Sequence, residues 1–322
     1  MNILYKYYSP KLDIIKYLEN PSVKLASTKS FNDPFEINIA NALAKKLAES
    51  FVELISIDNQ FNYGDIAEYT HLFKTISQDF GIVCLTETHR NILMWAHYAS
   101  SHEGFCIGYK SNFLSSGQTN KNSSVELNLN PHRVIYDKKR FDPSNYRDKK
   151  TFTELMIQAM TIKSDEWMYE KEHRCIVPTK LAERFTVTEG HSEETSKKIN
   201  ELIKTGNIVA AQNEHTYLFK KGKPPFIPIG LNTREIVSRI DGATLLKDIE
   251  ITSIQSIYFG SKASQNIIDA TIELIKTSPT KYGHISIYKY ELNKDDFELD
   301  LKCLLNEPSE FNIEGSIFNS TF

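Results

Sequence analysis

Residues 167–178 read WMYEKEHRCIVP and place two carboxylates and a guanidinium at alternate positions ahead of an apolar run. If this segment is extended, Glu170, Glu172 and Arg174 project from one face of a strand. Carboxylates held this close repel each other unless a cation or a ligand offsets them. The pattern therefore predicts a strand with a functional site, although Glu-Lys-Glu is also typical of a solvated edge strand.

Composition restricts the class of protein. The chain has 322 residues, of which 40% are hydrophobic, so it can bury a substantial core. A net charge of -3 gives no global signature of a nucleic-acid coat or a membrane-surface protein. The four cysteines are widely separated, which disfavours a zinc ribbon or a disulfide framework. We find no signal peptide and no apolar run that could span a bilayer, and we expect a cytoplasmic protein without a membrane partner.

Strand and helix patterns intermix along the chain without regular alternation. Strands are predicted at 3–8, 23–27, 81–86, 104–109, 133–137, 253–260 and 284–291, besides the carboxylate strand, and helices at 11–19, 91–101, 151–162 and 265–276, with two more between 39 and 78. This mixture predicts an α+β fold with a mixed or antiparallel sheet core and helical insertions. No Gly-x-Gly-x-x-Gly or Walker-type loop is present, which argues against a Rossmann or P-loop phosphate site.

The domain organisation follows from a change in composition after residue 179. We expect residues 1–179 and 246–305 to form a single catalytic α+β domain. Residues 183–204 are highly charged with a narrow apolar stripe, so 180–245 is predicted to be a helical and loop insertion. Residues 306–322 are predicted to be a poorly ordered tail.

Three polar clusters interrupt otherwise apolar segments. They are Tyr5, Lys6 and Tyr7 with Asn32, Asp33 and Glu36; Trp95, His97, Tyr98 and His102; and Glu170, Glu172 and Arg174 with Lys163 and Trp167. Simpler roles stand beside functional ones, since Asn32 and Asp33 are typical turn formers and Trp95 with Tyr98 suits an aromatic anchor under the sheet. No acid or cysteine accompanies the two histidines at metal-ligand spacing, so zinc is not predicted.

Several motifs in this order resemble a large bacterial family long labelled a domain of unknown function. They are LYKY near the start, SxxxFNDPFE, CLTE followed by MWAHYASSHEGFCIGY, and K(x)3W(x)2E(x)1E(x)1R, with a weaker match through SIYFG at 256–260. Members of that family recur in mobile and phage-defence gene neighbourhoods. The resemblance implies a toxin or anti-phage effector and gives no mechanism.

The segment EKEHRCIVP is also similar to the Glu-x-Glu segment of ADP-ribosyltransferases, in which the second carboxylate precedes an apolar strand. Those enzymes begin with an aromatic-rich strand that carries a polar residue and place Ser or Thr on a central strand. The resemblance implies an ADP-ribosyltransferase-like sheet with NAD as substrate. Catalytic roles then fall on Glu172, which would stabilise an oxocarbenium-like transition state, on Glu170, which would orient or deprotonate the acceptor, and on Thr86.

The same resemblance implies a set of NAD-binding residues. Lys6 or Tyr7 would take the place of an Arg or His that grips the dinucleotide, and Tyr98 or Trp95 would stack on nicotinamide. Ser27-Thr28-Lys29 is an alternative to Cys84-Leu85-Thr86 for the hydroxyl position. The full expected set is Tyr5, Lys6, Tyr7, Asn32, Asp33, Trp95, His97, Tyr98 and Arg174.

Three functions remain in competition. The first is transfer of ADP-ribose from NAD to a macromolecular acceptor, protein or nucleic acid, with an antitoxin protein as a further partner. The second is a metal-dependent nuclease in which Asp33, Glu36, Glu170, Glu172 and Lys163 collect a divalent cation. The third is a non-enzymatic sensor or binding module that uses the three polar clusters as a pocket.

Overall fold

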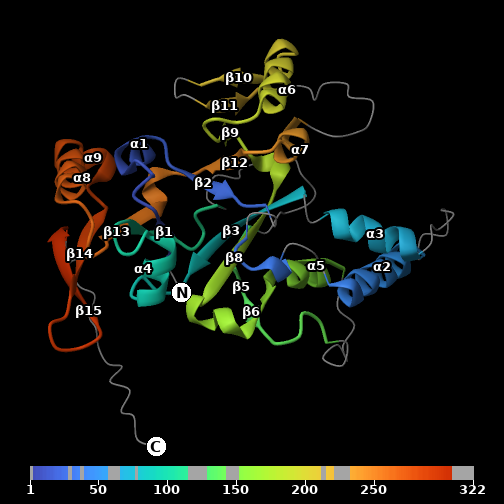
Figure 1. Ribbon diagram of the computed structural model, residues 1–322, viewed down its shortest axis with the longest axis horizontal. Helices are drawn as coiled ribbons and strands as arrows, with labels where there is room; N and C mark the ends of the chain where they lie inside the picture. The colour runs from blue at the N-terminus through green and yellow to red at the C-terminus, as the bar shows by residue number, and fades with distance from the viewer. Residues whose placement is uncertain are drawn as a thin grey trace, which may run out of the picture.

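The computed structural model describes residues 3–27, 31–36, 40–56, 66–76, 79–114, 129–142, 152–211, 215–220 and 233–306, and its centre is a sheet of eight strands (Figure 1). Neighbouring strands are antiparallel except for the parallel pair β13 and β14. The strand order is β15 (Leu299–Leu305), β14 (Ser286–Leu292), β13 (Ile254–Phe259), β4 (Phe105–Lys110), β1 (Ile3–Tyr8), β3 (Phe80–Thr86), β8 (Glu172–Pro178) and β5 (His132–Arg133).

A second sheet of five antiparallel strands packs beside the first. Its order is β10 (Ile208–Ala210), β11 (Thr216–Phe219), β9 (Arg184–Val187), β12 (Ala243–Asp248) and β2 (Ser22–Leu25). A bridge between Ala26 and Ile82 joins this sheet to β3 through two backbone hydrogen bonds of 3.0 and 2.8 Å. A short parallel pair, β6 (Ile135–Tyr136) and β7 (Ile162–Lys163), lies near the end of β8.

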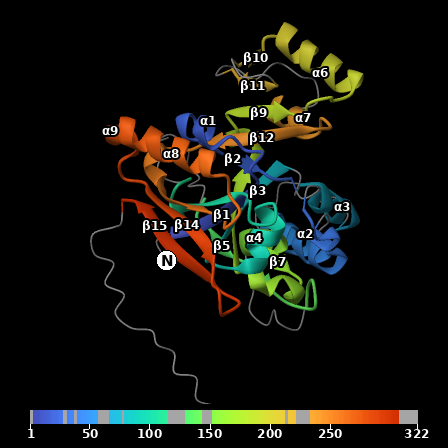
Figure 2. The same cartoon turned by 60° about the vertical axis from the view of Figure 1, so that its left-hand side comes forward.

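Helices lie around the two sheets in separate groups, as Figures 1 and 2 show from two directions. They are α1 (Ile14–Glu19), α2 (Asn41–Ser56), α3 (Ile66–Ile76), α4 (Ile92–Tyr98), α5 (Phe152–Thr161), α6 (Glu193–Lys204), α7 (Thr233–Ser238), α8 (Gln265–Thr277) and α9 (Pro279–Tyr282). Helices α1, α8 and α9 gather at one end, while α2, α3 and α5 pack together at the other.

Apolar side chains form three buried clusters that explain this arrangement. The largest fills the space between one face of the large sheet, the second sheet and α8, and Val177 of β8 is one of its fully buried members. On the opposite face, α2, α3 and α5 cover β3 and β8 around Ile82. A separate aromatic cluster around Trp95 packs α4 against β1, β4 and β13. The residues of the candidate site gather in the space between the two clusters on that face.

Strands β1 and β3 diverge beside this space. Over their described residues they pair at a single position, Tyr5 with Thr86. The Nζ of Lys6 donates a 2.9 Å hydrogen bond to the carbonyl of Cys84 and so supplies a partner to a β3 carbonyl beside the single paired position. The centre of the sheet is therefore open enough to expose polar groups of β1 and β3 to a cavity.

The mixed α and β architecture with several sheets agrees with the sequence prediction. The secondary structure of 180–245 differs from the predicted helical and loop insertion, because its described part contains β9, β10, β11 and the start of β12 besides α6 and α7. The predicted strand at 23–27 forms as β2 but belongs to the second sheet. Residues 115–124, whose Ser, Asn, Gly and Gln content predicts a surface loop, and nearly all of the predicted tail lie outside the described residues.

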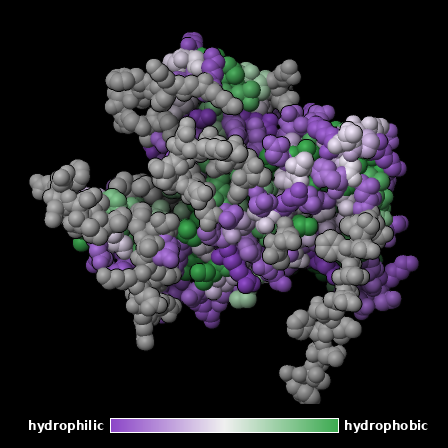
Figure 3. Space-filling view, turned by 180° about the vertical axis from the view of Figure 1, so that it is seen from behind, coloured by the Kyte–Doolittle hydropathy of each residue, from purple (hydrophilic) through white to green (hydrophobic). Residues whose placement is uncertain are grey.

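The surface and the helices bear on the predicted environment of the protein. Figure 3 shows that hydrophilic residues cover most of the described surface on the face seen from behind, with scattered hydrophobic areas between them. Among the described residues, no helix has the length and apolar character needed to cross a membrane.

Gly81 on β3 lies close to the second sheet, so a substitution there tests how the two sheets pack. A Cβ at this position would lie 2.4 Å from Cβ of Leu25 on β2. We expect Gly81→Ala to lower the free energy of unfolding by about 1–3 kcal/mol, because β2 and β3 must separate to admit the methyl group. Urea unfolding of the variant checks this, and an unchanged midpoint would show that the sheets yield freely.

Candidate functional site

The segment 167–178 enters the site through a turn rather than as one continuous strand. Residues Asp165–Glu170 form a 3-10 helix, Lys171 adopts a left-handed conformation with φ 44°, and β8 begins at Glu172. The predicted alternation therefore holds for Glu172 and Arg174 but not for Glu170. Glu170 nevertheless reaches the same place, because the turn folds its side chain back toward β7.

Five charged side chains meet there and form what we call the ion cluster: Glu36, Lys163, Glu170, Glu172 and Arg174. Their side chains are only 2–7% exposed. The cluster holds three carboxylates and two cations, a formal charge of -1. Buried ions require close opposite charges and saturated hydrogen bonds to be tolerated, and the contacts within the cluster meet that requirement.

Arg174 makes the most directional contacts of the cluster. Its Nε and Nη2 donate to Oε1 and Oε2 of Glu172, both at 2.9 Å, in a two-pronged pair. Its Nη1 donates to the carbonyl of Met160 at 2.9 Å, and Nη2 also contacts a carboxylate oxygen of Glu36. The guanidinium lies 5.1 Å from the ring centre of Phe31.

Lys163 links all three carboxylates. Its Nζ lies 2.6 Å from Oε2 of Glu170, 3.2 Å from Oε2 of Glu172 and 3.7 Å from Oε2 of Glu36. The ammonium also lies 4.7 Å from the ring centre of Trp167. Lys163 thus offsets the repulsion between the two carboxylates that the sequence brings together.

These contacts set the protonation states of the cluster. Burial alone favours a neutral acid, but the Arg174 guanidinium and the Lys163 ammonium outweigh it and lower the pKa of Glu172 to about 2. Burial dominates at Glu36, whose pKa is raised. Although burial disfavours the charge on Lys163, the surrounding carboxylates raise its pKa. Glu172 is therefore a fixed negative charge at neutral pH.

Hydroxyl groups from outside the cluster hold the Glu170 carboxylate and the backbone of Glu170 and Glu172. Tyr98 on α4 donates to Oε1 of Glu170 at 2.5 Å. Tyr136 accepts a 2.7 Å hydrogen bond from the backbone N–H of Glu172. Thr86 donates to the backbone carbonyl of Glu170 at 2.6 Å, so the turn before β8 is tied to β3.

A cavity of about 310 Å3 opens beside the cluster, and we call it the strand cavity. Strand register aligns Tyr5 on β1 with Thr86 on β3, and Thr86 with Glu172 on β8. Neighbouring positions in register present their side chains to the same face, and all three line the cavity. The predicted site residues that line it are Tyr5, Lys6, Tyr7, Asn32, Thr86, Tyr98, Glu170, Glu172 and Arg174.

Three predicted NAD-binding residues lie elsewhere. Trp95 is fully buried, donates its indole N–H to the carbonyl of His89 at 2.9 Å and does not line the strand cavity. It is the aromatic anchor that the simpler interpretation described. His97 is exposed on α4 outside the cavity. Asp33 forms a turn, in which its Oδ1 accepts the backbone N–H of Phe35 at 2.9 Å.

Four charged or aromatic residues that line the strand cavity are absent from the expected transferase set, although the nuclease alternative includes Glu36 and Lys163. Lys163 is the first residue of the K(x)3W(x)2E(x)1E(x)1R motif, and Phe31 and Glu36 belong to the FNDPFE motif, so the sequence carried a signal for these three. Lys24 lines the strand cavity from the second sheet. Nothing in its local pattern pointed to that position, because it depends on how the two sheets pack.

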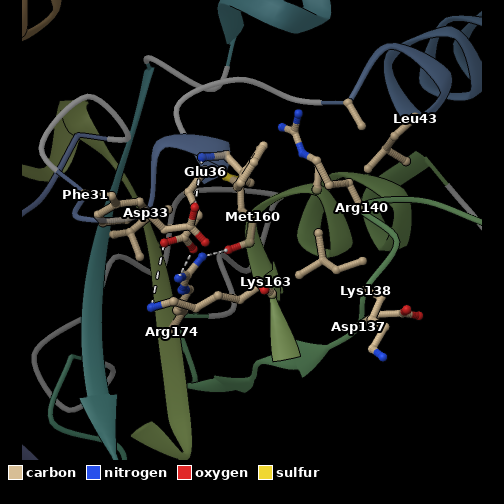
Figure 4. Close-up of a pocket in the computed structure, with 16 residues that line it drawn as sticks. Phe31, Asp33, Glu36, Leu43, Asp137, Lys138, Arg140, Met160, Lys163 and Arg174 are labelled. Carbon is tan, nitrogen blue, oxygen red and sulfur yellow. Dashed lines mark hydrogen bonds and ion pairs between the residues drawn. The ribbon is translucent and has the colours of Figure 1, made fainter. Parts of the chain in front are cut away.

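A second cavity of about 210 Å3 lies on the other side of the ion cluster, and we call it the side cavity. Phe31, Glu36, Lys163 and Arg174 line both cavities and form a shared wall. Figure 4 shows Glu36, Lys163 and Arg174 meeting on one side of this cavity, with Leu43, Lys138 and Arg140 across from them. Among the residues that the structure describes, no group of three or more His, Cys, Asp or Glu side chains is placed to share a metal ion.

The lowered pKa of Glu172 predicts a specific acid dependence. A carboxyl whose pKa falls from 4.5 to about 2 on folding contributes stability that is present above the unfolded value and lost as the pH falls toward about 2. We expect the difference in unfolding free energy between wild type and Glu172→Gln to shrink by about 3 kcal/mol across that range. Urea titrations at a series of pH values measure it.

Glu36 provides the control with the opposite sign. Its pKa is raised on folding, so the wild-type protein gains stability relative to Glu36→Gln as the pH falls. If both variants followed the same pH trend, the assignment of charges within the ion cluster would be wrong.

A double substitution separates the contribution of the Arg174–Glu172 pair to stability from the cost of leaving one of its charges buried alone. Arg174→Met removes the fork and leaves three buried carboxylates with Lys163 as their only cation in the ion cluster, so we expect a loss of about 3–5 kcal/mol in unfolding free energy. Adding Glu172→Met removes the stranded charge and should restore more than half of that loss, measured by urea unfolding. Lys197→Met breaks an exposed pair with Glu193 and should leave stability unchanged. A double variant no more stable than Arg174→Met would contradict the interpretation.

Comparison with known proteins adds one finding. Residues 94–175 match the model of a family described as "Protein of unknown function (DUF2971)". The matched region runs from α4 to β8 and contains Lys163, Glu170, Glu172 and Arg174, whereas β1 and Glu36 lie outside it. No curated protein and no solved structure matches the chain. The match agrees with the resemblance to a family of unknown function.

Proposed function

We propose that this chain is an ADP-ribosyltransferase that transfers ADP-ribose from NAD to a macromolecule. The observation that carries the proposal is the row formed by Tyr5, Thr86 and Glu172 across β1, β3 and β8. The resemblance to ADP-ribosyltransferases implies an aromatic first strand, a hydroxyl on a central strand and the second carboxylate of Glu-x-Glu. These three features come from distant parts of the chain and line one cavity in register.

The charge of Glu172 suits the chemical step. When the bond between nicotinamide and ribose breaks, its electron pair leaves with nicotinamide and positive charge develops on the sugar ring. A carboxylate fixed beside that ring stabilises the developing cation without reorganising. With a pKa near 2 and both oxygens held by Arg174 or Lys163, Glu172 is charged and immobile. It supplies the electrostatic part of the mechanism.

Glu170 takes the acceptor side of the reaction. The acceptor forms a bond to the anomeric carbon and gives up a proton, which needs a base nearby. Glu170 lies next to Glu172 in the cluster, receives hydrogen bonds from Tyr98 and Lys163, and lines the same cavity. These contacts orient its carboxylate toward the bound sugar, where it orients the acceptor or accepts its proton.

Two lysines supply the charge that a dinucleotide requires. Lys6 and Lys24 both line the strand cavity. The pKa of Lys24 is lowered by burial and by the nearby Lys6, which means that the two ammonium groups repel each other when no anion is present. A diphosphate bound between them would relieve that repulsion.

A toxin or anti-phage role, with an antitoxin as partner, rests on the gene neighbourhoods of the resembling family.

The nuclease alternative draws on the same convergence of Glu36, Glu170, Glu172 and Lys163. In the ion cluster, however, Lys163 and Arg174 occupy the space between the carboxylates, and Asp33 lies apart in the side cavity. This arrangement favours a fixed anion over a site that gathers a divalent cation. Activity that a chelator abolishes and that ignores NAD would reverse the ranking.

Labelling with NAD tests the proposal. NAD carrying radioactive phosphate next to adenosine, incubated with the protein and a cell lysate, should label a macromolecule. We expect Glu172→Gln to lower the labelling rate by about 100-fold or more, since it removes a charge aimed at the transition state. Glu193→Gln, on the exposed surface of α6, should label at the wild-type rate.

Folding must be separated from catalysis in this test. Thermal unfolding shows whether Glu172→Gln is folded, and therefore whether a loss of labelling is a loss of catalysis. Lys24→Gln, at a position that lines the strand cavity, provides a second variant that should raise KM for NAD with less effect on kcat. Wild-type labelling by folded Glu172→Gln, or toxicity on expression that survives loss of both Glu170 and Glu172, would rule the transferase out.

A further inference from the structure

The side cavity has the features of a ligand site that the proposed reaction does not use. Its inner wall is apolar and aromatic, built from residues such as Phe31, Leu43, Ile82 and Met160. The ion cluster closes one side of it through Glu36, Lys163 and Arg174, as Figure 4 shows. A volume of about 210 Å3 suits a single flat heterocycle better than a bulky ligand.

One polar atom in this cavity lacks a partner. Asp33 is 2% exposed, and its Oδ1 accepts the backbone N–H of Phe35. None of the described residues offers a hydrogen bond to its Oδ2, although that atom is buried. Leaving a buried carboxylate oxygen unpaired costs free energy. A ligand that donates an N–H to Oδ2 would remove this cost.

The charges around the cavity indicate what kind of molecule carries that donor. Four cations and three carboxylates line it, a net charge of +1. Lys138 and Arg140 are exposed, and Lys139 between them pairs with Asp142 at 2.6 Å. A cationic protein side chain in the cavity would be repelled by Lys138 and Arg140, which line it. A ligand that carries a neutral hydrogen-bond donor and is otherwise negatively charged meets no such repulsion.

We propose that the side cavity binds a nucleobase with an exocyclic amino group, presented by a single strand of nucleic acid. The amino group donates to Oδ2 of Asp33, as acidic side chains accept from the amino group of cytosine. The flat ring lies against Phe31 and Met160, and Lys138 with Arg140 contacts the phosphates. As a claim about binding this stands alone; as an identification of the acceptor it rests on the proposed transferase function.

Oligonucleotides that differ only in the amino group provide the sharpest test. Cytosine carries the amino group where uracil carries a carbonyl oxygen, so fluorescent single strands of deoxycytidine and deoxyuridine form a matched pair. Fluorescence anisotropy at low salt and without NAD measures their affinities. We expect the protein to bind the cytosine strand about tenfold more tightly, the value of one hydrogen bond to a charged acceptor.

Asp33→Asn is the decisive variant because it keeps the shape and the turn. The amide oxygen can still accept the N–H of Phe35, while the amide nitrogen places a donor where Oδ2 was. The preference should vanish or reverse toward uracil, which offers an acceptor. Lys138→Ala with Arg140→Ala should weaken both strands equally and reduce the salt dependence of binding. Lys276→Ala, remote on α8, should change neither.

Three outcomes would overturn the proposal. Equal affinity for the cytosine and uracil strands would show that Asp33 does not read the base. A preference that survives in folded Asp33→Asn would place the recognition elsewhere. Binding of arginine-rich peptides in place of oligonucleotides, with the same dependence on Asp33, would assign the cavity to protein ligands. Because NAD is absent, none of these results depends on whether the transferase proposal holds.

Discussion

The pairing of Arg174 with Glu172 is the interaction on which the site depends. Two ions buried this completely are tolerated only with fixed geometry and further partners. Those partners are Glu36, from the turn after residue 33, and the carbonyl of Met160, near the end of α5. Strand β8, helix α5 and an N-terminal turn are thus held together by one guanidinium. Arg174 and Glu36 line both cavities, so this contact forms part of the wall between them.

The local part of this site could be predicted from the sequence, because strand periodicity relates Glu172 to Arg174 directly. Motif spacing also marked Lys163, although no periodic argument assigned it a role. Strand periodicity could not predict the contact with Glu36, since it joins residues 138 positions apart, although the nuclease alternative grouped Glu36 with Lys163 and Glu172. Trp95 shows the opposite failure. Its neighbours suggested ligand stacking, whereas the packing of α4 on β1 buries it completely.

The second sheet could not be predicted from composition. Charged residues between 183 and 204 suggested helix, and α6 does form there. The strands around it are short. Their apolar residues, such as Phe185 and Val187, could not be assigned to a sheet without knowing which distant segments pair with them. Strand β2 follows the same rule, because its local pattern predicts a strand but not the sheet it joins. Lys24 reaches the strand cavity as a result.

The wall shared by the two cavities has a thermodynamic consequence. Glu36, Lys163 and Arg174 face both compartments, so an ion arriving in either one alters the electrostatic field felt in the other. By linkage, that influence is equal in both directions: whatever one occupant does to the affinity of the second, the second does to the first. The partition that separates the two compartments also makes them energetically interdependent.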